Sequence, residues 1–444
     1  MGVIERLKSP ITRLSHNETA TSNISGELSQ LVKHVDDSGF TRASLTYAWY
    51  HAHWFRDAAM AVHALTDTAD FLNGSNNRKA KLAQDAAGRI INFTWDTIAK
   101  YKDGINNALS LDPESEEFKL LKNHLPARVS KYGNYFACIR DGRPYTDQIE
   151  DDKDSWLRQY DSIPLSIIAT EKFINSFGIS ALSQKTKSNI KGMLRASIKY
   201  MLKTYNAPGA NAWELDWDEV HAYTAASISK GLRSAADIAD RLGVYIGDLG
   251  DLQEKADGID RFIEKSFVRE GVLYKSAKAT GNGTTAEPNL SVDSSEIFIF
   301  SMFRPKLSKE VEENTVRAME KELFDGNVLP IRYQKDPYFF GGRWLLLGLE
   351  FARYYSRNGR QEDAKRILDY VNEKYIKQDF SLPEQELVNP ANLDDPDHYF
   401  ERNGSSMIRE LGWSEAEYLR AAIAYSRNQA AESQRNVLAA TARN

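Results

Sequence analysis

The apolar residues of this chain recur at three- and four-residue spacing along most of its length, which is the period of an amphipathic α-helix. The spacing predicts helices over residues 26–36, 57–71, 78–101, 157–177, 183–204, 221–242, 249–266, 309–323, 338–357, 360–376 and 414–428, with further helices near 4–14, 113–121 and 294–303. Strand signals are weak, and the best of them, residues 272–276, indicates half of a small hairpin. Helices without strands between them cannot build a doubly wound sheet, so they must pack on one another.

Two all-α architectures suit such a chain: an open solenoid of helix pairs and a closed ring of helix pairs. A solenoid usually shows a repeat of fixed length, and none is visible in the 444 residues. We therefore expect a closed, double-layered helical barrel over residues 1–428, followed by a polar C-terminal tail over residues 429–444.

Long segments between the predicted helices carry polar and aromatic residues together. They cover residues 102–156, 205–220, 267–293, 324–337 and 377–413. Loops of this length are uncommon and often serve a function. In a helical barrel the loops at one end converge on a central pocket, so the functional residues are expected there.

The charge balance and the cysteine content argue against several functions. The net charge is -5 and no basic block occurs, so a nucleic-acid partner is not expected. Cys138 is the only cysteine, so no internal disulfide forms and nothing requires an oxidising compartment. No apolar run approaches the roughly 18 residues of a membrane span, and residues 1–14 lack the apolar core of a signal peptide. We expect a cytoplasmic monomer without membrane contact.

No cofactor motif is present in the sequence. It has neither a glycine-rich phosphate loop nor a pair of cysteines. His51 and His53 suggest a metal site, but no acidic or cysteine partner lies at ligand spacing. Neither a metal nor another cofactor is expected.

A cluster of aromatic and charged residues precedes the predicted helix at 57–71. Arg56 and Asp57 could hold sugar hydroxyls by charge-assisted hydrogen bonds, with Trp54 as an apolar platform. The simpler interpretation is that Asp57 caps the helix and Trp54 belongs to the core.

A second cluster places Glu214 in a loop between Trp213 and Trp217. Indole rings shield a carboxyl from water and favour its protonated form, which a general acid requires. The alternative is an exposed acidic loop before the helix at 221–242.

Glu384, after Pro383, is a second loop carboxylate. Glycoside hydrolysis needs two such groups, an acid that protonates the leaving oxygen and a carboxylate that activates water or attacks. Other segments allow either pocket lining or ordinary turns and packing. They are Trp156 with Gln159 and Asp161, and Arg332 with the stretch to Trp344.

Six segments, in this order, resemble glycoside hydrolase family 15, the glucoamylase family, over about residues 45–425. They are Trp54-Phe55-Arg56-Asp57, Trp156 with Gln159 and Asp161, Trp213-Glu214, Arg332-Tyr333 through Asp336 to Gly342 and Trp344, Leu382-Pro383-Glu384-Gln385, and Leu411-Gly412-Trp413-Ser414. The resemblance implies an (α/α)6 barrel that hydrolyses terminal α-glucosyl units with inversion and releases β-glucose.

The resemblance also implies roles for single residues. Glu214 would be the general acid and Glu384 the general base, and Tyr50 would lie near the catalytic water. Arg56 and Asp57 would hold the non-reducing glucose in subsite −1. The other substrate-binding residues would be Trp54, Trp156, Gln159, Asp161, Trp213, Leu215, Arg332, Tyr333, Trp344 and Trp413.

Three positions depart from the family pattern. Leu215 follows the acid where the family often has a second acidic residue, Glu386 replaces an aromatic residue, and Gly342-Arg343 replaces Asn-Pro. The departures leave the linkage open, and the apolar Leu215 favours α-1,6-linked or short substrates over starch. A cytoplasmic enzyme meets imported sugars more readily than starch, so we expect a short α-gluco-oligosaccharide such as isomaltose or maltose as substrate. The rival functions are a trehalase, a disaccharide phosphorylase and a non-catalytic helical binding scaffold. A phosphorylase needs no separate base, so Glu384 argues against it.

Overall fold

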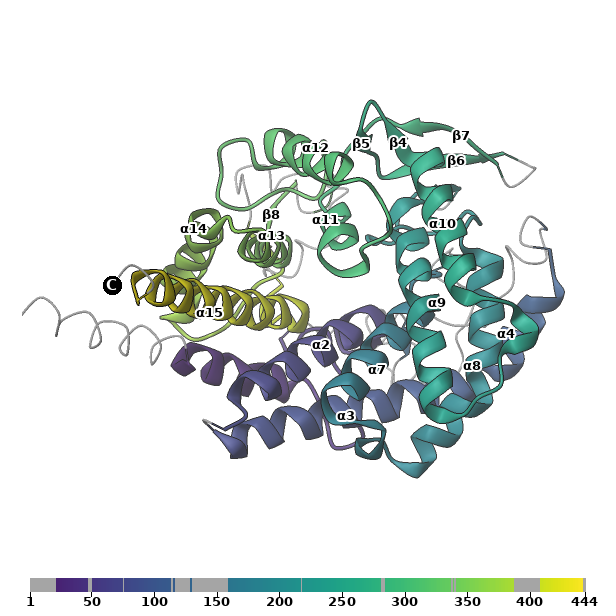
Figure 1. Ribbon diagram of the computed structural model, residues 1–444, viewed down its shortest axis with the longest axis horizontal. Coiled ribbons are helices and arrows are strands. Elements are labelled where there is room, and N and C mark those ends of the chain that lie inside the picture. Colours follow the sequence, from purple (N-terminus) through teal and green to yellow (C-terminus); the bar gives the residue numbers. More distant parts are fainter. Residues whose placement is uncertain are drawn as a thin grey trace, which may run out of the picture.

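The computed structural model describes residues 21–46, 50–74, 76–112, 115, 128–129, 159–216, 218–280, 284–336, 338, 341–386 and 408–441. Helices dominate these residues and surround a common centre (Figure 1). The helix expected at 4–14, nearly all of 113–121, Cys138, Trp156 and Trp217 lie outside the described residues. No described helix combines the length and the apolar character needed to cross a membrane.

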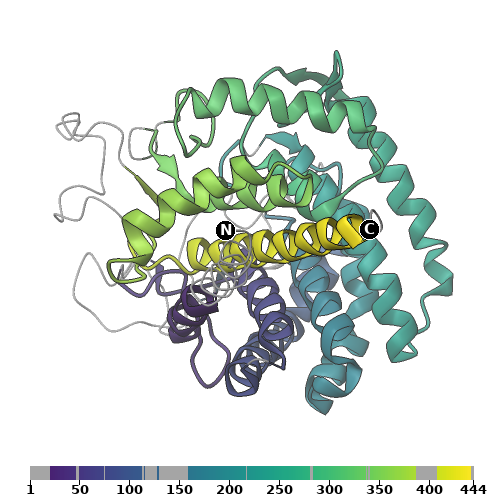
Figure 2. The ribbon, with the colours of Figure 1, turned by 60° about the vertical axis from the view of Figure 1, so that its left-hand side comes forward.

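An inner layer of helices closes into a ring. Its members are α2 (Phe55–Leu72), α7 (Ser162–Phe177), α9 (Ala222–Leu242), α11 (Glu296–Phe298) with the π-helix Ile299–Phe303, α13 (Leu345–Arg357) and α15 (Gly412–Thr441). Each of them packs against the next, and α15 returns to α2 (Figure 2). Nearly every residue of α13 is buried, as expected of a helix covered on all sides.

An outer layer covers this ring. It contains a helix over residues 21–33, α3 (Asn77–Lys100), α8 (Gln184–Thr204), α10 (Leu252–Phe267), α12 (Lys309–Met319) and α14 (Gln361–Val371). These helices are amphipathic: α14 buries Ala364, Ile367, Leu368 and Val371, at the three- and four-residue spacing of one helical face. One continuous apolar core joins the two layers, and the predicted closed (α/α)6 barrel is confirmed.

Short strands lead into the inner helices at one end of the barrel. β1 (His53–Trp54) precedes α2, β3 (Glu219–His221) precedes α9, and β8 (Arg343–Trp344) precedes α13. β1 pairs with β2 (Arg128–Val129), and β8 pairs with β9 (Gln385–Glu386), both antiparallel. The pairing brings residues from distant loops to the N-terminal ends of the inner helices.

A β-ribbon extends from the barrel between α10 and α11, at the top right of Figure 1. β4 (Val268–Arg269) pairs with β5 (Val272–Leu273), which is the predicted hairpin. β6 (Ser276–Thr280) pairs with β7 (Thr284–Asn289) and with β3. The sequence interpretation had placed β6 and β7 in a loop.

Several predicted boundaries were wrong. The helix expected at 26–36 covers residues 21–33, and the one expected at 157–177 begins at Ser162. Residues 102–110 form α4 (Lys102–Ser110) rather than loop, and its buried Ile105 and Ala108 explain why. The helix predicted from 338 begins at Leu345, because Gly341 has φ 76° and β8 follows it. α15 continues to Thr441 instead of ending at 428, since its exposed last turns are rich in alanine and other good helix formers.

Candidate active site

Glu384 lies where three segments of the chain meet. Its backbone N–H donates to Ile408 at 2.9 Å, and its backbone carbonyl accepts from the Leu345 N–H at 3.2 Å. These two hydrogen bonds hold it between the approach to α15 and the start of α13. The side chain is 6% exposed, so it is a buried carboxyl at a fixed position.

Two tyrosine hydroxyls bind the Glu384 carboxylate. Tyr50 donates to Oε1 and Tyr338 donates to Oε2, each at 3.1 Å, and the two hydroxyl oxygens are 2.8 Å apart. Burial raises the pKa of Glu384 to about 7, although Arg332 and the two hydroxyl donors act to lower it. A carboxyl with a pKa near neutrality is suited to accept a proton from water.

Glu214 is held in a left-handed backbone conformation, with φ 66°. Such a conformation costs energy for a residue with a side chain, and it persists only where the surroundings enforce it. Here the Asn211 side chain accepts from the N–H groups of Trp213 at 2.8 Å and Leu215 at 3.0 Å. The carboxyl is half-buried, and the Trp54 indole donates to its Oε1 at 3.0 Å.

The two carboxyl groups are connected by a pair of aromatic rings. Tyr50 binds Glu384 and Trp54 binds Glu214, and the centroids of these two rings are 5.4 Å apart. Tyr50 also interacts electrostatically with both carboxylates. Glu214 and Glu384 therefore border one site, although they come from widely separated loops.

Arg56 lies in the first turn of α2, beside these groups. Its Nε donates to Asp161 at 2.9 Å and another nitrogen donates to the Ala212 carbonyl. Its remaining NH2 group is buried and has no hydrogen-bond partner within the described residues. This group therefore has unused hydrogen-bonding capacity in the buried surroundings of the two carboxyl groups.

Asp57, the next residue, is half-buried in the first turn of α2. Burial raises its pKa to about 7, with Arg56 acting to lower it and Glu214 to raise it. The helix begins at Phe55, with Trp54 at the cap position and no side-chain cap. The interpretation of Asp57 as the N-cap is therefore wrong.

Arg332 is enclosed by aromatic rings. Asp336 accepts two hydrogen bonds of 2.6 Å from its guanidinium. The guanidinium carbon lies 4.7 Å from the ring centroids of both Tyr338 and Trp344 and 5.3 Å from that of Trp213. The result is a rigid wall of aromatic and cationic groups next to Glu384.

The other predicted site residues have different degrees of exposure. Gln159 and Trp413 are buried, whereas Leu215 and Tyr333 are half-buried. Trp413 lies 5.9 Å from the Arg56 guanidinium and Tyr333 lies 5.5 Å from that of Arg332.

Sequence reasoning missed two residues that shape the site. Tyr338 binds the carboxylate of Glu384, and Asp293 accepts the Trp213 indole N–H at 2.8 Å. Tyr338 lies in the stretch from Arg332 to Trp344 that the sequence analysis considered, but no adjacent residue in the sequence linked it to Glu384. Asp293 carried no signal, because an aspartate before two serines is typical of an ordinary turn.

The histidines considered as metal ligands have structural roles. His53 accepts from the Thr41 backbone N–H at 3.1 Å, and burial lowers its pKa to about 3. His51 contacts the Leu45 carbonyl at 3.3 Å. Among the described residues no group of three potential metal ligands was found.

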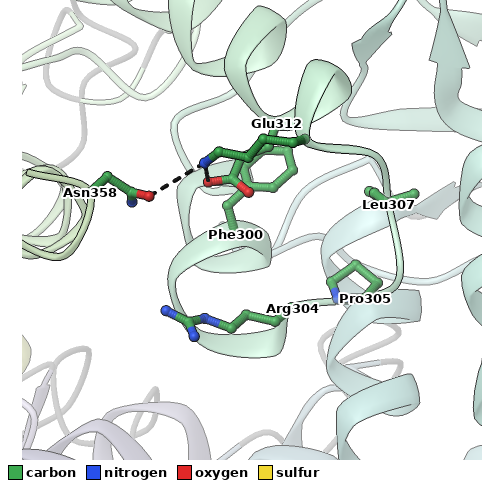
Figure 3. A pocket seen from close by; sticks show the side chains of 7 residues that line it. Phe300, Arg304, Pro305, Leu307, Glu312 and Asn358 are labelled. Atoms are coloured by element: carbon green, nitrogen blue, oxygen red, sulfur yellow. Dashed lines mark hydrogen bonds and ion pairs between the residues drawn. The ribbon is translucent and has the colours of Figure 1, made fainter.

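A surface pocket lies at the other end of α13 (Figure 3). Its lining includes Phe300, Arg304 and Asn358, which caps the C-terminus of that helix. Lys309 pairs with Glu312 at 2.9 Å and contacts Asn358 at 3.4 Å. These polar groups satisfy one another, and neither Glu214 nor Glu384 lies among the lining residues, so this pocket does not compete with the carboxylate site.

Comparisons with known proteins agree with the resemblance seen in the sequence. The family model described as glycosyl hydrolases family 15 matches residues 24–317. No curated protein matches the chain. A solved glycosidase variant in complex with glucose has a TM-score of 0.71 at 19% identity, with 93% of this chain and 98% of that chain covered.

Two further solved structures share the fold. A wild-type glycosidase has a TM-score of 0.70 at 20% identity over 93% of this chain and 98% of that chain. The glucoamylase of Hormoconis resinae has a TM-score of 0.59 at 15% identity over 93% of this chain and 74% of that chain. The family match ends before Arg332 and Glu384, so their assignment depends on the geometry described above.

Proposed function

Since the chain belongs to glycosyl hydrolase family 15 and is therefore a glycoside hydrolase, we propose that it removes glucose from the non-reducing ends of short α-gluco-oligosaccharides by single displacement. Glu214 is the general acid and Glu384 is the general base. The observation that supports this most strongly is the Tyr50–Trp54 ring pair, because each ring binds one carboxylate at the same site.

In the proposed reaction Glu384 takes a proton from a water molecule. The water oxygen forms a bond to the anomeric carbon while the bond to the leaving oxygen breaks, and Glu214 gives its proton to that oxygen. The two tyrosine hydroxyls fix the direction of the Glu384 carboxylate. Since the water enters opposite the leaving group, the configuration at the anomeric carbon inverts and β-glucose is released.

The groups around the carboxylates suit a glucosyl unit. The buried NH2 of Arg56 and the Asp57 carboxyl supply charge-assisted hydrogen bonds to sugar hydroxyls. Arg332 and its aromatic wall, including Trp213 and Trp344, offer flat surfaces against which sugar C–H faces pack. The neighbour solved with glucose in place supports the same class of ligand.

The proposal of a short substrate is based on Leu215, the residue that follows the proposed acid Glu214. Leu215 is half-buried and apolar, so it gives the leaving sugar no charged partner beyond Glu214. We propose isomaltose or maltose as the substrate, and an enzyme that acts in the cytoplasm as a monomer. The two carboxyl groups suffice for the chemistry, and we propose no cofactor.

Hydrolysis rates on isomaltose, maltose, trehalose and soluble starch test the substrate class. We expect rapid turnover of isomaltose or maltose and slow turnover of starch, without added phosphate. A clear starch preference would contradict the short-substrate proposal, and a trehalose preference would indicate a trehalase. Turnover that requires phosphate would indicate a phosphorylase.

A further inference from the structure

Glu417 lies on α15, one helical turn after Trp413, and its side chain is fully buried. Its Oε1 accepts from the Trp413 indole N–H at 3.1 Å and from Arg420 at 2.6 Å. The proposed reaction uses neither its charge nor its proton. Burying an ionisable group is costly, so its position calls for an explanation.

Glu417 belongs to a buried cluster of ionisable side chains on α13 and α15. Arg353 donates to both carboxylate oxygens of Glu350, and Arg420 lies 3.7 Å from the same carboxylate. Burial raises the pKa of Glu417 to about 8, although Arg420 acts to lower it. The raised pKa favours the uncharged carboxyl, and this form still has an oxygen that accepts the indole N–H.

Trp413 connects this cluster to the sugar-binding end of the barrel. Its ring centroid lies 5.9 Å from the Arg56 guanidinium carbon and 5.9 Å from the Phe298 ring centroid. Arg56 is otherwise held by Asp161 and the Ala212 carbonyl. The direction of its NH2 group depends on the orientation of the guanidinium, which the Trp413 ring borders at this distance.

We propose that Glu417 is a positioning residue for substrate binding, because it holds the Trp413 ring against Arg56 and so directs Arg56 toward the glucosyl unit. This inference rests on the proposed function. Glu417 itself contacts no substrate and transfers no proton. Arg56 binds the glucosyl unit before and during the reaction, so loss of its alignment should raise KM more than it lowers kcat.

Two substitutions of Glu417 separate positioning from charge. Glu417→Gln keeps an oxygen that accepts the Trp413 N–H, and we expect kinetics close to those of the wild type. Glu417→Leu removes the acceptor, and we expect KM to rise about 10- to 100-fold, the usual effect of a small misplacement of a binding group. Ser301→Ala is the matched control, because it alters the same cluster at Glu350 rather than at the hydrogen bond between Glu417 and Trp413; it should lower thermal stability without raising KM.

A double-mutant cycle between Glu417→Leu and Arg56→Lys provides the decisive measurement. The readouts are KM and the dissociation constant of glucose measured by calorimetry. If Glu417 acts through Arg56, the leucine substitution adds little in the Arg56→Lys background. Effects that multiply independently would overturn the proposal, as would a Ser301→Ala variant with the same KM change.

Glu417→Met serves in the cycle if Glu417→Leu does not fold, because it also removes the acceptor and its flexible side chain adapts to the buried space. The experiments distinguish failure of the proposed function from failure of the proposed role of Glu417. A wild-type protein that hydrolyses no α-glucoside contradicts the function, and the glucose dissociation constants still test Glu417. Hydrolysis by the wild type with independent effects of the two substitutions contradicts only the role of Glu417.

Discussion

The Tyr338 hydroxyl donates to Glu384 at 3.1 Å, across 46 positions of sequence, and shares this carboxylate with Tyr50. Both oxygens of the proposed base therefore have a hydroxyl donor. Burial nevertheless keeps the pKa of Glu384 near 7. The site combines a carboxylate fixed in direction with a basicity matched to neutral pH.

Removing one of these donors should move the pH profile. Both hydrogen bonds act to lower the pKa of Glu384, so Tyr338→Phe should raise it above about 7. The acidic limb of the kcat/KM profile, which reports this group in the free enzyme, should then shift to higher pH. Tyr375→Phe is the control, because that hydroxyl binds Glu386 instead. An unmoved acidic limb in Tyr338→Phe would show that Glu384 is not the base.

Replacing the proposed base should abolish most turnover. Glu384→Gln should lower kcat by about 100- to 10,000-fold, the usual contribution of a general base. Glu386→Gln is the matched control two residues later, since Glu386 binds Tyr370 and Tyr375 rather than the site. A steady-state assay on the best substrate measures kcat for both variants. Equal losses of kcat would contradict the assignment of Glu384 as the general base.

The loss of activity on replacing the proposed acid should depend on the leaving group of the substrate. Glu214→Gln should lower kcat on isomaltose or maltose by about 100- to 10,000-fold. Fluoride leaves without protonation, so hydrolysis of α-glucosyl fluoride should be largely retained in this variant and lost in Glu384→Gln. Asp218→Asn, at an exposed position of the same loop, should affect neither substrate strongly. A Glu214→Gln variant that loses both activities equally would argue against an acid role.

Burial of the proposed base should also lower the free energy of unfolding at high pH. The folded-state pKa of Glu384 is raised from 4.5 to about 7, so the folded protein binds more protons than the unfolded chain between these values. Stability therefore falls as the pH rises through this window. Glu384→Gln should be more stable than the wild type at pH 8, by up to about 3 kcal/mol, and should gain nothing at pH 4. Thermal unfolding at the two pH values measures the difference.

Close packing in the inner ring can be tested away from the site. A Cβ at Gly231 on α9 would lie 2.6 Å from Pro164 and 3.0 Å from Met201, so Gly231→Ala should destabilise the barrel by about 1–3 kcal/mol. A Cβ at Gly192 on α8 would meet nothing within 4 Å, so Gly192→Ala should stabilise the protein by about 0.5–1 kcal/mol. Thermal unfolding that ranks the two variants in the opposite order would contradict this account of the inner ring.

The helical layers could be predicted from sequence because their evidence is local. The spacing of Ala364, Ile367, Leu368 and Val371 is enough to indicate a buried face on α14. The unexpected α4 shows the limit of that evidence, because only Ile105 and Ala108 are buried in it. Two apolar contacts are too few to establish a helical period.

The site was predictable only in part, because its geometry depends on pairing between distant segments. Pairing of β8 with β9 places Glu384 beside the start of α13. No local pattern could show that Tyr338 would meet Glu384, or that Asp293 would hold Trp213. The functional roles of Glu214 and Glu384 stay predictions that only kinetics can test.

The most direct test of the proposed mechanism is proton NMR of the anomeric signals during the first minutes of hydrolysis. Purified protein is mixed with isomaltose, maltose or trehalose in separate tubes, without phosphate. Glu384 acting as a base on water predicts that β-glucose appears first and that the α-anomer grows in only by mutarotation. Early α-glucose would mean retention, and it would contradict the assignment of Glu384 as the base.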